Sequence, residues 1–301
     1  MTAQTDSLRQ ADHSQKAASS PFEERQADSV AWKINSEIVL LAGWNPAIML
    51  QVAHPLVAAG VVDHSLFLTD PAGRARRLWR TLNVMFDLTF GLPDEVQRAA
   101  DAINAIHDRV NGQLREASGP FEAGQRYSAH DPELLRWVHC TMLEVFPRAY
   151  RLYVGPLSDA EWDQYCAEAS RVEPLLGLPD GYLPRSRHEL QVYLRTMLDG
   201  GQIAVSEQSR MLAREILRPR APLLLRPLIP FFQLPMVGLL PPSVRAAYGF
   251  PWDRRREHLL QDSARIIRPL LALTPSLFRH WPAARRAFAR ARLGELRPPS
   301  G

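Results

Sequence analysis

The sequence contains very little lysine and very little cysteine. Only Lys16 and Lys33 are lysines, so the other 34 of the 36 basic residues are arginines. The formal net charge is only +4 and no long basic block occurs, which argues against a nucleic-acid-binding protein. Cys140 and Cys166 are too few for a cysteine metal cluster and form no Cys-x-x-Cys pair, so we expect them to be reduced, buried thiols.

The N-terminal stretch lacks the apolar core of a signal peptide and has no paired arginines, so we expect a cytoplasmic protein. Residues 1–28 are polar and are predicted to form a disordered or loosely docked arm, and residues 294–301 a flexible tail. The hydrophobic content of 46% suffices for a large core. We therefore expect one globular domain over residues 29–293.

Alternating strand patterns are nearly absent, and apolar residues instead recur at three- and four-residue spacing. Two helix starts are well marked, by Pro71 after Thr69 and Asp70, and by the capping-box pattern of residues 158–161. The sequence therefore predicts an all-α fold built as a single globular helical bundle. The expected helices are 31–43, 45–60, 70–90, 93–117, 131–154, 158–176, 186–199, 203–217, 241–247, 252–270 and 275–293.

Seven prolines interrupt the apolar stretch 218–242. A membrane-spanning helix would lose too many backbone hydrogen bonds to that many prolines. Two interpretations stay open. The stretch is either a buried irregular connection that wraps the helical core, or a greasy rim that makes peripheral contact with a membrane or admits a lipophilic substrate.

The nine histidines include no His-Glu-x-x-His motif and no repeated Glu-x-x-His pair, so a zinc hydrolase and a di-iron carboxylate enzyme are poorly supported. His107 differs from the others because Ile103, Ile106 and Val110 are spaced to turn its imidazole toward the interior of the predicted helix. Such a histidine is either a hydrogen-bonded core residue or a single axial haem ligand. Spacing alone does not decide between the two.

The segment RLWRT, residues 77–81, places Arg77, Arg80 and Thr81 within about one helical turn. One interpretation is that the basic cluster faces water. The other is that it is partly buried, because the following residues 82–91 are almost wholly apolar. A buried guanidinium needs a partner, which Asp87, a haem propionate or an iron-bound oxygen species would supply.

Polar side chains also surround a run of small residues between positions 53 and 60. Small side chains let either a neighbouring helix or a flat cofactor approach closely. Gln51, His54 and His64 are therefore candidates for contacts with a cofactor, whereas His54 is alternatively expected to cap or to bond locally because it precedes Pro55.

Several of these segments, in this order, resemble the signature blocks of the MpaB-type oxygenases, also called the rubber oxygenase catalytic-domain family. The family includes the latex-clearing proteins of bacteria and the fungal oxygenase of mycophenolic acid biosynthesis. The resemblance runs from about residue 31 to 200 and weakly beyond. The matching blocks are residues 36–65, 77–81, 90–91, 107–112 and 127–139.

The resemblance implies a largely helical, globin-like core around haem b, which acts with dioxygen on apolar, often isoprenoid, double bonds. It also implies that His107 is the proximal iron ligand. Arg77 and Thr81 match the distal arginine and threonine, which would face dioxygen and stabilise developing negative charge. The resulting hypothesis is a haem b-dependent oxygenase that acts on a small lipophilic molecule, such as an isoprenoid or a polyketide.

Two positions depart from the family pattern. Latex-clearing proteins carry an iron-ligating lysine where this chain has Arg80, and arginine stays protonated and has no lone pair to give. No glutamate between Gly60 and Arg77 matches the proposed base of rubber cleavage, so we do not expect rubber to be the substrate. A non-catalytic haem- or lipid-binding protein on the same scaffold, and a helical partner-binding protein without a cofactor, stay open as alternatives.

Overall fold

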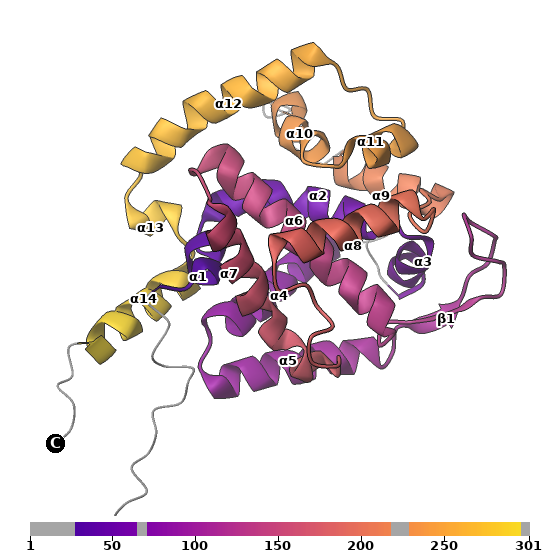
Figure 1. Cartoon of the computed structure of the whole chain (residues 1–301), viewed down its shortest axis with the longest axis horizontal. Coiled ribbons are helices and arrows are strands. Elements are labelled where there is room, and N and C mark those ends of the chain that lie inside the picture. Colours follow the sequence, from indigo (N-terminus) through magenta and orange to yellow (C-terminus); the bar gives the residue numbers. More distant parts are fainter. Residues whose placement is uncertain (1–27, 65–70, 218–228, 296–301) are drawn as a thin grey trace, which may run out of the picture.

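The computed structural model describes residues 28–64, 71–217 and 229–295, which are almost entirely helical (Figure 1). The predicted all-α fold is confirmed, and a short antiparallel strand pair is the exception within these ranges. Residues 1–27 of the expected arm and 296–301 of the expected tail lie outside the described residues. The elements are α1 (Val30–Asn35), η1 (Ile38–Leu40), α2 (Leu41–Gln51), α3 (Pro55–His64), α4 (Pro71–Phe90), α5 (Pro93–His107), β1 (Asn111–Gln113), β2 (Arg126–Ser128), α6 (Pro132–Tyr153), α7 (Asp159–Ala169), η2 (Ser170–Val172), η3 (Pro174–Leu176), α8 (Arg187–Asp199), α9 (Glu207–Leu217), α10 (Ile229–Gly238), α11 (Pro242–Tyr248), α12 (Arg254–Leu273), α13 (Ser276–Arg279) and α14 (Pro282–Glu295).

Helix α6 forms the centre of the main hydrophobic core, with α2, α7, α8 and α12 packed around it (Figure 1). It begins sharply because the Asp131 side chain accepts a hydrogen bond from the Glu133 backbone N–H and Pro132 occupies the first helical position. Trp137 is fully buried on α6, and Trp162 on α7 donates its indole N–H to the Leu143 carbonyl. This rigid centre fixes the start of α6, beside which the candidate site lies.

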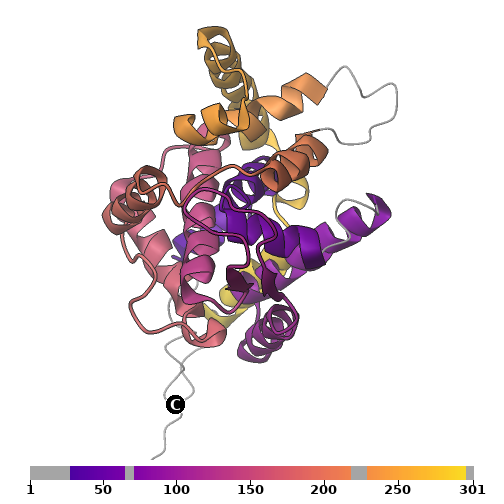
Figure 2. The same cartoon turned by 90° about the vertical axis from the view of Figure 1, so that its right-hand side faces the viewer.

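A second cluster joins the two ends of the described chain. Trp32 of α1 packs edge-on against Phe90 of α4 and Phe288 of α14, with ring centroids 5.7 Å and 5.6 Å apart. Trp281 contacts Phe86 of α4 at 4.9 Å. Figures 1 and 2 both show the yellow C-terminal helix beside the indigo N-terminal one. Helix α4 is therefore held between the first and the last helices.

Helices α2 and α3 are separated by a sharp break before Pro55, because proline cannot donate the backbone hydrogen bond that would continue α2. In the described part of the chain, no single helix has both the length and the hydropathy needed to cross a membrane. The segments Ile38–Gln51 and Pro55–His64 satisfy that test only when taken together, and they meet at a bend of 107°.

The prediction of a helix over residues 93–117 is correct only as far as residue 107. Helix α5 ends at His107, and a hairpin follows in which Gly112 pairs with Tyr127. The Asn111 side chain donates to the Asp108 carbonyl, a local bond that competes with helix continuation. At Gly112 an added Cβ would lie 2.6 Å from the Tyr127 hydroxyl oxygen, so only glycine fits against this ring. The hairpin loop projects from the body at the right of Figure 1.

The proline-rich stretch 218–242 also differs from the expected irregular connection. Its first part, 218–228, lies outside the described residues, but residues 229–238 form α10, with Pro235 inside the helix. Phe231 and Phe232 near the start of α10 are about half exposed. The stretch is therefore partly helical, and it presents aromatic rings to solvent.

Candidate functional site

His107 is the last residue of α5 and is half-buried. Its Nδ1 atom is buried and has no hydrogen-bond partner in the described part of the protein. Burial is the main cause that lowers the pKa of His107, the neighbouring His130 lowers it further, and Asp108 opposes both. A neutral imidazole with an unpaired nitrogen has the donor chemistry of a metal ligand.

His130 lies next to His107, with the two rings edge-on and their centroids 5.7 Å apart. Its Nε2 atom lies 2.8 Å from Asp108 Oδ1, an interaction that orients the His130 ring toward the end of α5. The expected inward face of this helix is only partly present, because Ile103 and Val110 are partly buried but Ile106 is 49% exposed. Ile106 is exposed because α5 ends one residue later, where the hairpin begins.

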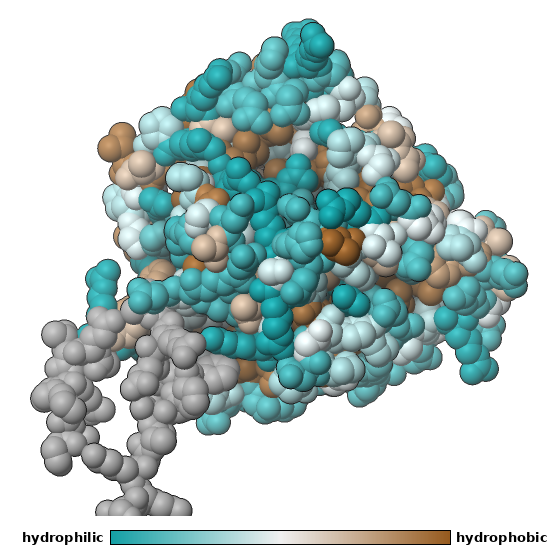
Figure 3. Space-filling view, in the orientation of Figure 1, coloured by the Kyte–Doolittle hydropathy of each residue, from teal (hydrophilic) through white to brown (hydrophobic). Residues whose placement is uncertain are grey.

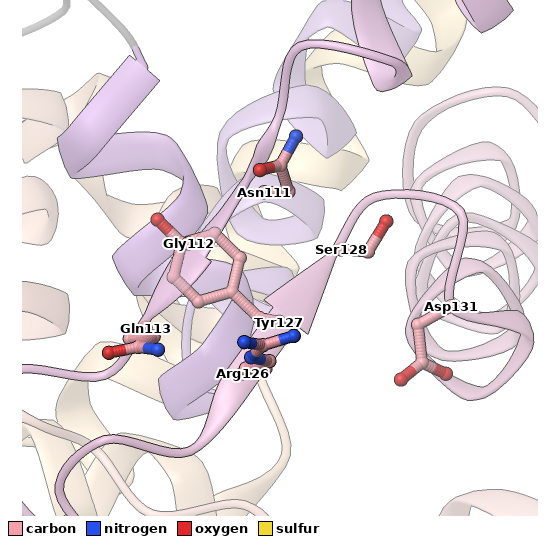
Figure 4. Close-up of a pocket in the computed structure, with 7 residues that line it drawn as sticks. All are labelled: Asn111, Gly112, Gln113, Arg126, Tyr127, Ser128 and Asp131. Carbon is pink, nitrogen blue, oxygen red and sulfur yellow. The ribbon is translucent and has the colours of Figure 1, made fainter.

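An open hollow of about 530 Å³ lies beside the hairpin (Figure 4). In the close-up, the Tyr127 ring lies over β1, and Asp131 stands apart at the start of α6. The hollow therefore lies between the hairpin and the start of the central helix α6. Its lining residues are Asn111, Gly112, Gln113, Arg126, Tyr127, Ser128 and Asp131.

The end of α3 is tied to this hairpin by the side chains of Asp63 and His64. Asp63 accepts hydrogen bonds from the Tyr127 hydroxyl at 2.8 Å and from Arg115 at 2.7 Å. Burial is the largest cause that raises the pKa of Tyr127 far above its usual value, and the hydrogen bond to the Asp63 carboxylate is the second. The hydroxyl therefore stays protonated and donates. His64 Nε2 lies 2.9 Å from the Asn111 carbonyl oxygen. Sequence reasoning missed Tyr127, because its pairing with Asp63 spans 64 positions and no local pattern signals it.

Gln51 and His54 occupy the break between α2 and α3. The Gln51 side chain donates to the Val138 carbonyl at 3.5 Å, and the Gln51 backbone carbonyl accepts from the Trp137 indole N–H at 3.1 Å. His54 is only 3% exposed, and its Nδ1 accepts from the Leu56 backbone N–H at 3.3 Å, as the expectation of local bonding had it. These contacts anchor the break against α6.

Small residues on α3 pack closely, as the helix-packing interpretation expected. Ala58, Ala59 and Gly60 are buried, and a Cβ added at Gly60 would lie 3.4 Å from Val110 and 3.5 Å from the Tyr127 ring. The groups that approach Gly60 closely are therefore the side chains of Val110 and Tyr127.

The pKa of His54 gives a testable pH dependence. Burial lowers this pKa from 6.5 to about 4, against a smaller opposing effect of Asp131. Between these values the unfolded chain binds the proton and the folded chain does not, so the free energy of unfolding should fall as the pH drops through this window, by about 3 kcal/mol at its lower end. His54→Asn keeps an acceptor for the Leu56 N–H but cannot titrate, so its stability should fall less steeply.

The measurement is urea unfolding at several pH values between 6.5 and 4. Burial also lowers the pKa of His139 to about 4, so the variant should retain part of the slope. His258→Asn, which changes an exposed histidine of α12, serves as the control and should leave the slope unchanged. A His54→Asn slope equal to that of the wild type would contradict the assignment.

The RLWRT segment lies in the middle of α4, where the side chains of residues 78–81 are exposed, although the Trp79 ring also lies edge-on to Trp281. Leu78 is 39% and Trp79 57% exposed, and Arg80 and Thr81 are exposed as well. The side chain of Arg77 lies outside the described residues. The deep packing expected for this helix is found at Leu82 and Phe90 but not in this turn.

Helices α4 and α5 pack against each other. The structure thus brings His107, His130 and Asp108 together at one end of α5. It places Gln51 and His54 at the neighbouring helix break and His64 at the hairpin. Arg80 and Thr81 lie on a separate, exposed turn.

The chemistry of His107 at the end of α5 fits a residue that would hold haem iron. A haem iron takes four nitrogens from the porphyrin and needs only one or two from the protein. The unpaired, buried Nδ1 of His107 and its lowered pKa show that this imidazole is neutral and not committed to another partner within the described residues. Within those ranges, no three His, Cys, Asp or Glu side chains lie close enough to hold a metal ion by themselves.

Comparisons with known proteins give one family and two relatives. The sequence model for "ER-bound oxygenase mpaB/B′/Rubber oxygenase, catalytic domain" matches residues 32–269. The uncharacterized proteins Mb2261 of Mycobacterium bovis and Rv2237 of Mycobacterium tuberculosis are each 28% identical to this chain over 235 residues, which cover 76% of this chain and 87% of the relative. No solved structure matches the chain.

Proposed function

Because this chain belongs to the family of ER-bound oxygenase mpaB/B′ and rubber oxygenase catalytic domains, we propose that it is a haem b-dependent oxygenase that acts with dioxygen on a small lipophilic molecule. The match spans most of the chain, so an oxidoreductase function rests on the whole domain. The observation that carries the haem assignment is the buried, unpartnered Nδ1 of a neutral His107.

His107 is the protein ligand to the iron in this proposal. Its lowered pKa keeps a lone pair available at neutral pH, so the metal does not compete with a proton. When bound, haem b supplies a redox-active iron for oxidation by dioxygen. The His130 ring, held by Asp108, packs edge-on against the His107 ring and would limit its movement on that side.

Arg77 and Thr81 are the proposed hydrogen-bond donors toward oxygen. A guanidinium and a hydroxyl both donate hydrogen bonds, and such donors would stabilise negative charge that develops on oxygen once cofactor and substrate exclude water from this turn. Arg80 lies beside them and adds positive charge, but it has no lone pair with which to ligate iron.

The exposed turn of α4 also supplies apolar surface for the substrate. Leu78 and Trp79 lie in the same turn as the two proposed donors, and both are substantially exposed. A lipophilic molecule that packs on this turn would be held next to Arg77 and Thr81. This arrangement supports a lipophilic substrate for the oxygenase.

Gln51, His54 and His64 complete the proposed cofactor environment. The first two are held by hydrogen bonds to the Val138 carbonyl and the Leu56 N–H, so they would position the α2–α3 break against the cofactor. His64 is exposed and reaches the hairpin at Asn111, so it would lie at the rim.

The decisive test is the absorption spectrum of the purified protein, made with haem supplied during expression. We expect a Soret band that shifts on reduction with dithionite, and a pyridine haemochrome spectrum typical of haem b. A colourless protein would overturn the proposal. A Soret band without oxygen uptake in the presence of an unsaturated isoprenoid such as squalene would favour the haem-binding alternative without catalysis.

Thr81→Val should separate oxygen chemistry from haem binding. Valine keeps the shape of threonine but cannot donate, so haem content should stay close to that of the wild type. The rate at which dithionite-reduced protein reoxidises in air-saturated buffer should change, and oxygen uptake with substrate should fall by about 100-fold. Arg77→Ala should act in the same direction.

The control is Asn83→Ala, which alters another exposed side chain of α4. It should change neither haem content nor reoxidation. Full oxygen uptake in both Thr81→Val and Arg77→Ala would exclude the proposed role of these donors.

A further inference from the structure

Helix α12 exposes a row of large apolar side chains to solvent. Leu259 is 49%, Ile266 63%, Leu270 60% and Leu273 83% exposed. Their spacing of seven, four and three residues places them on one side of the helix, over a length of about 21 Å. Helix α13 continues the row with Leu277 and Phe278, which are 57% and 70% exposed. We call these six residues the α12–α13 face.

This face is distinct from the side of α12 that packs on the protein. Leu260 and Ala264 are buried against the main core, and Ile267 and Leu271 are partly buried against it. The helix thus has one apolar side for the core and a second apolar side with no cover among the described residues. Figure 3 shows hydrophobic surface at the upper left, over the C-terminal end of α12, next to hydrophilic surface along the rest of that edge.

The same part of the chain is strongly basic. Residues 254–295 contain ten arginines and three acidic residues, a formal charge of +7, whereas the whole chain carries +4. The remaining residues therefore carry −3. Arg255 precedes Leu259 by one helical turn, so it extends the α12–α13 face at its N-terminal end. The charge of the protein is thus concentrated around its most exposed apolar surface.

A hollow of about 540 Å³ opens between α13 and α14, directly beside this face. Leu277 belongs to both, and Arg285 and Arg292 approach the hollow from α14. The Nε atom of Arg285 is buried and has no hydrogen-bond partner among the described residues. Ser276 Oγ and His280 Nδ1, which also line the hollow, lie 2.9 Å apart and pair with each other, so the guanidinium groups of Arg285 and Arg292 would supply the donors for an anionic oxygen ligand. The hollow is lined by Ser276, Leu277, His280, Arg285, Phe288, Ala289 and Arg292.

We propose that the α12–α13 face and the adjoining hollow dock the protein onto an anionic phospholipid surface. The six apolar side chains enter the acyl boundary, and Arg285 and Arg292 bind headgroup phosphate in the hollow. An amphipathic helix that lies in the interface plane has this combination of apolar residues on one side and arginines around them. Charge alone would also suit a nucleic acid, but exposed leucine, isoleucine and phenylalanine side chains in a continuous row favour lipid.

Helix α10, in the apolar stretch 218–242, also carries exposed aromatic rings. Helix α10 packs against α12, and its Phe231 and Phe232 rings are 48% and 56% exposed. The sequence suggested membrane contact through this stretch, of which 218–228 lies outside the described residues. The structure adds α12 and α13 as the longer apolar surface. This inference is independent of the haem proposal, because lipid binding needs no cofactor.

The test is flotation of the full chain with vesicles of phosphatidylcholine alone and of phosphatidylcholine mixed with phosphatidylglycerol. We expect binding to the mixed vesicles, weak binding to the neutral ones, and loss of binding as salt is raised. Leu273→Ser combined with Phe278→Ser should weaken binding to the mixed vesicles by at least about tenfold. Arg285→Gln combined with Arg292→Gln should weaken binding to the mixed vesicles more than binding to the neutral ones.

Val192→Ser is the matched control, because Val192 is an exposed apolar residue on α8, away from this face. It should bind vesicles as the wild type does. Three outcomes would overturn the proposal. In the first, the Leu273→Ser, Phe278→Ser variant binds vesicles as well as the wild type does. In the second, phosphate binds in the hollow but the protein does not bind vesicles. In the third, the protein does not bind vesicles but self-associates, and the same variant abolishes the self-association.

Discussion

Replacement of His107 by alanine is expected to lower the affinity of the protein for haem by more than about 100-fold. Loss of a residue that only orients a metal ligand typically costs about 10- to 100-fold, and His107 is the proposed ligand itself. Because the His107 side chain is only half-buried at the end of α5, its replacement should lower haem affinity without a large loss of folding stability.

The measurement is the haem-to-protein ratio after gel filtration, determined as the pyridine haemochrome. His107→Gly should regain a Soret band when imidazole is added, because free imidazole can occupy the space that the side chain leaves. His188→Ala, which removes an exposed histidine of α8, should retain full haem content. A wild-type Soret spectrum in His107→Ala would show that another residue holds the cofactor.

Replacement of Glu37 by glutamine is expected to lower the free energy of unfolding by about 3–5 kcal/mol, because it leaves Arg279 without its counter-charge in a mostly buried site. Glu37 is 2% exposed, and both of its oxygens lie 2.9 Å from Arg279 Nε. A third contact, from Arg279 Nη2, measures 2.6 Å, and His280 lies 3.5 Å away. The hydrogen bond to Glu37 is the main cause that raises the pKa of Arg279.

Urea unfolding at neutral pH measures this loss. Asp262→Asn is the control, because it breaks an exposed ion pair with Arg265 and should cost less than about 1 kcal/mol. Replacing both Glu37 and Arg279 with leucine should recover part of the stability, since two apolar side chains leave no charge unpaired. A Glu37→Gln variant within about 1 kcal/mol of the wild type would contradict this account.

Helices with clear end signals could be predicted from the sequence. Ser158 and Glu161 form the expected capping box of α7, and α6 begins one residue after the expected position 131, with Asp131 as its cap. Such signals act within three or four residues, so they are visible in any short window of sequence. Helix α4 likewise begins at Pro71, as predicted.

The ends of several helices could not be predicted so well. Helix α7 stops at Ala169 and is followed by two short 3-10 turns around Pro174, where one helix to residue 176 was expected. The hairpin after His107 depends on Gly112 meeting the Tyr127 ring, a contact between segments that apolar spacing does not register. Apolar spacing alone favoured continuing the helix, and the contacts of the hairpin overrode it.

The candidate site was only partly predictable for the same reason. His107 stands out by its position among apolar residues, and the matching family blocks draw attention to it. The contacts around it come from His130 and Asp108, and the Asp63 to Tyr127 bond closes the hairpin from another helix. These pairings depend on how α3, α5 and the hairpin meet, which no single segment specifies.

The closure of the N-terminal and C-terminal segments on each other has a consequence for biosynthesis. The Trp281 backbone N–H bonds to the Ser36 carbonyl at 3.0 Å, and the cluster that secures α4 needs Trp281, Ala284 and Ala287 from the far end of the chain. While the chain is still on the ribosome, Trp32 and Leu82 have no α14 to pack against. The helix that carries Arg77 and Thr81 can therefore reach its final packing only after α14 has emerged from the ribosome, and a cofactor that requires this packing must be loaded after that point.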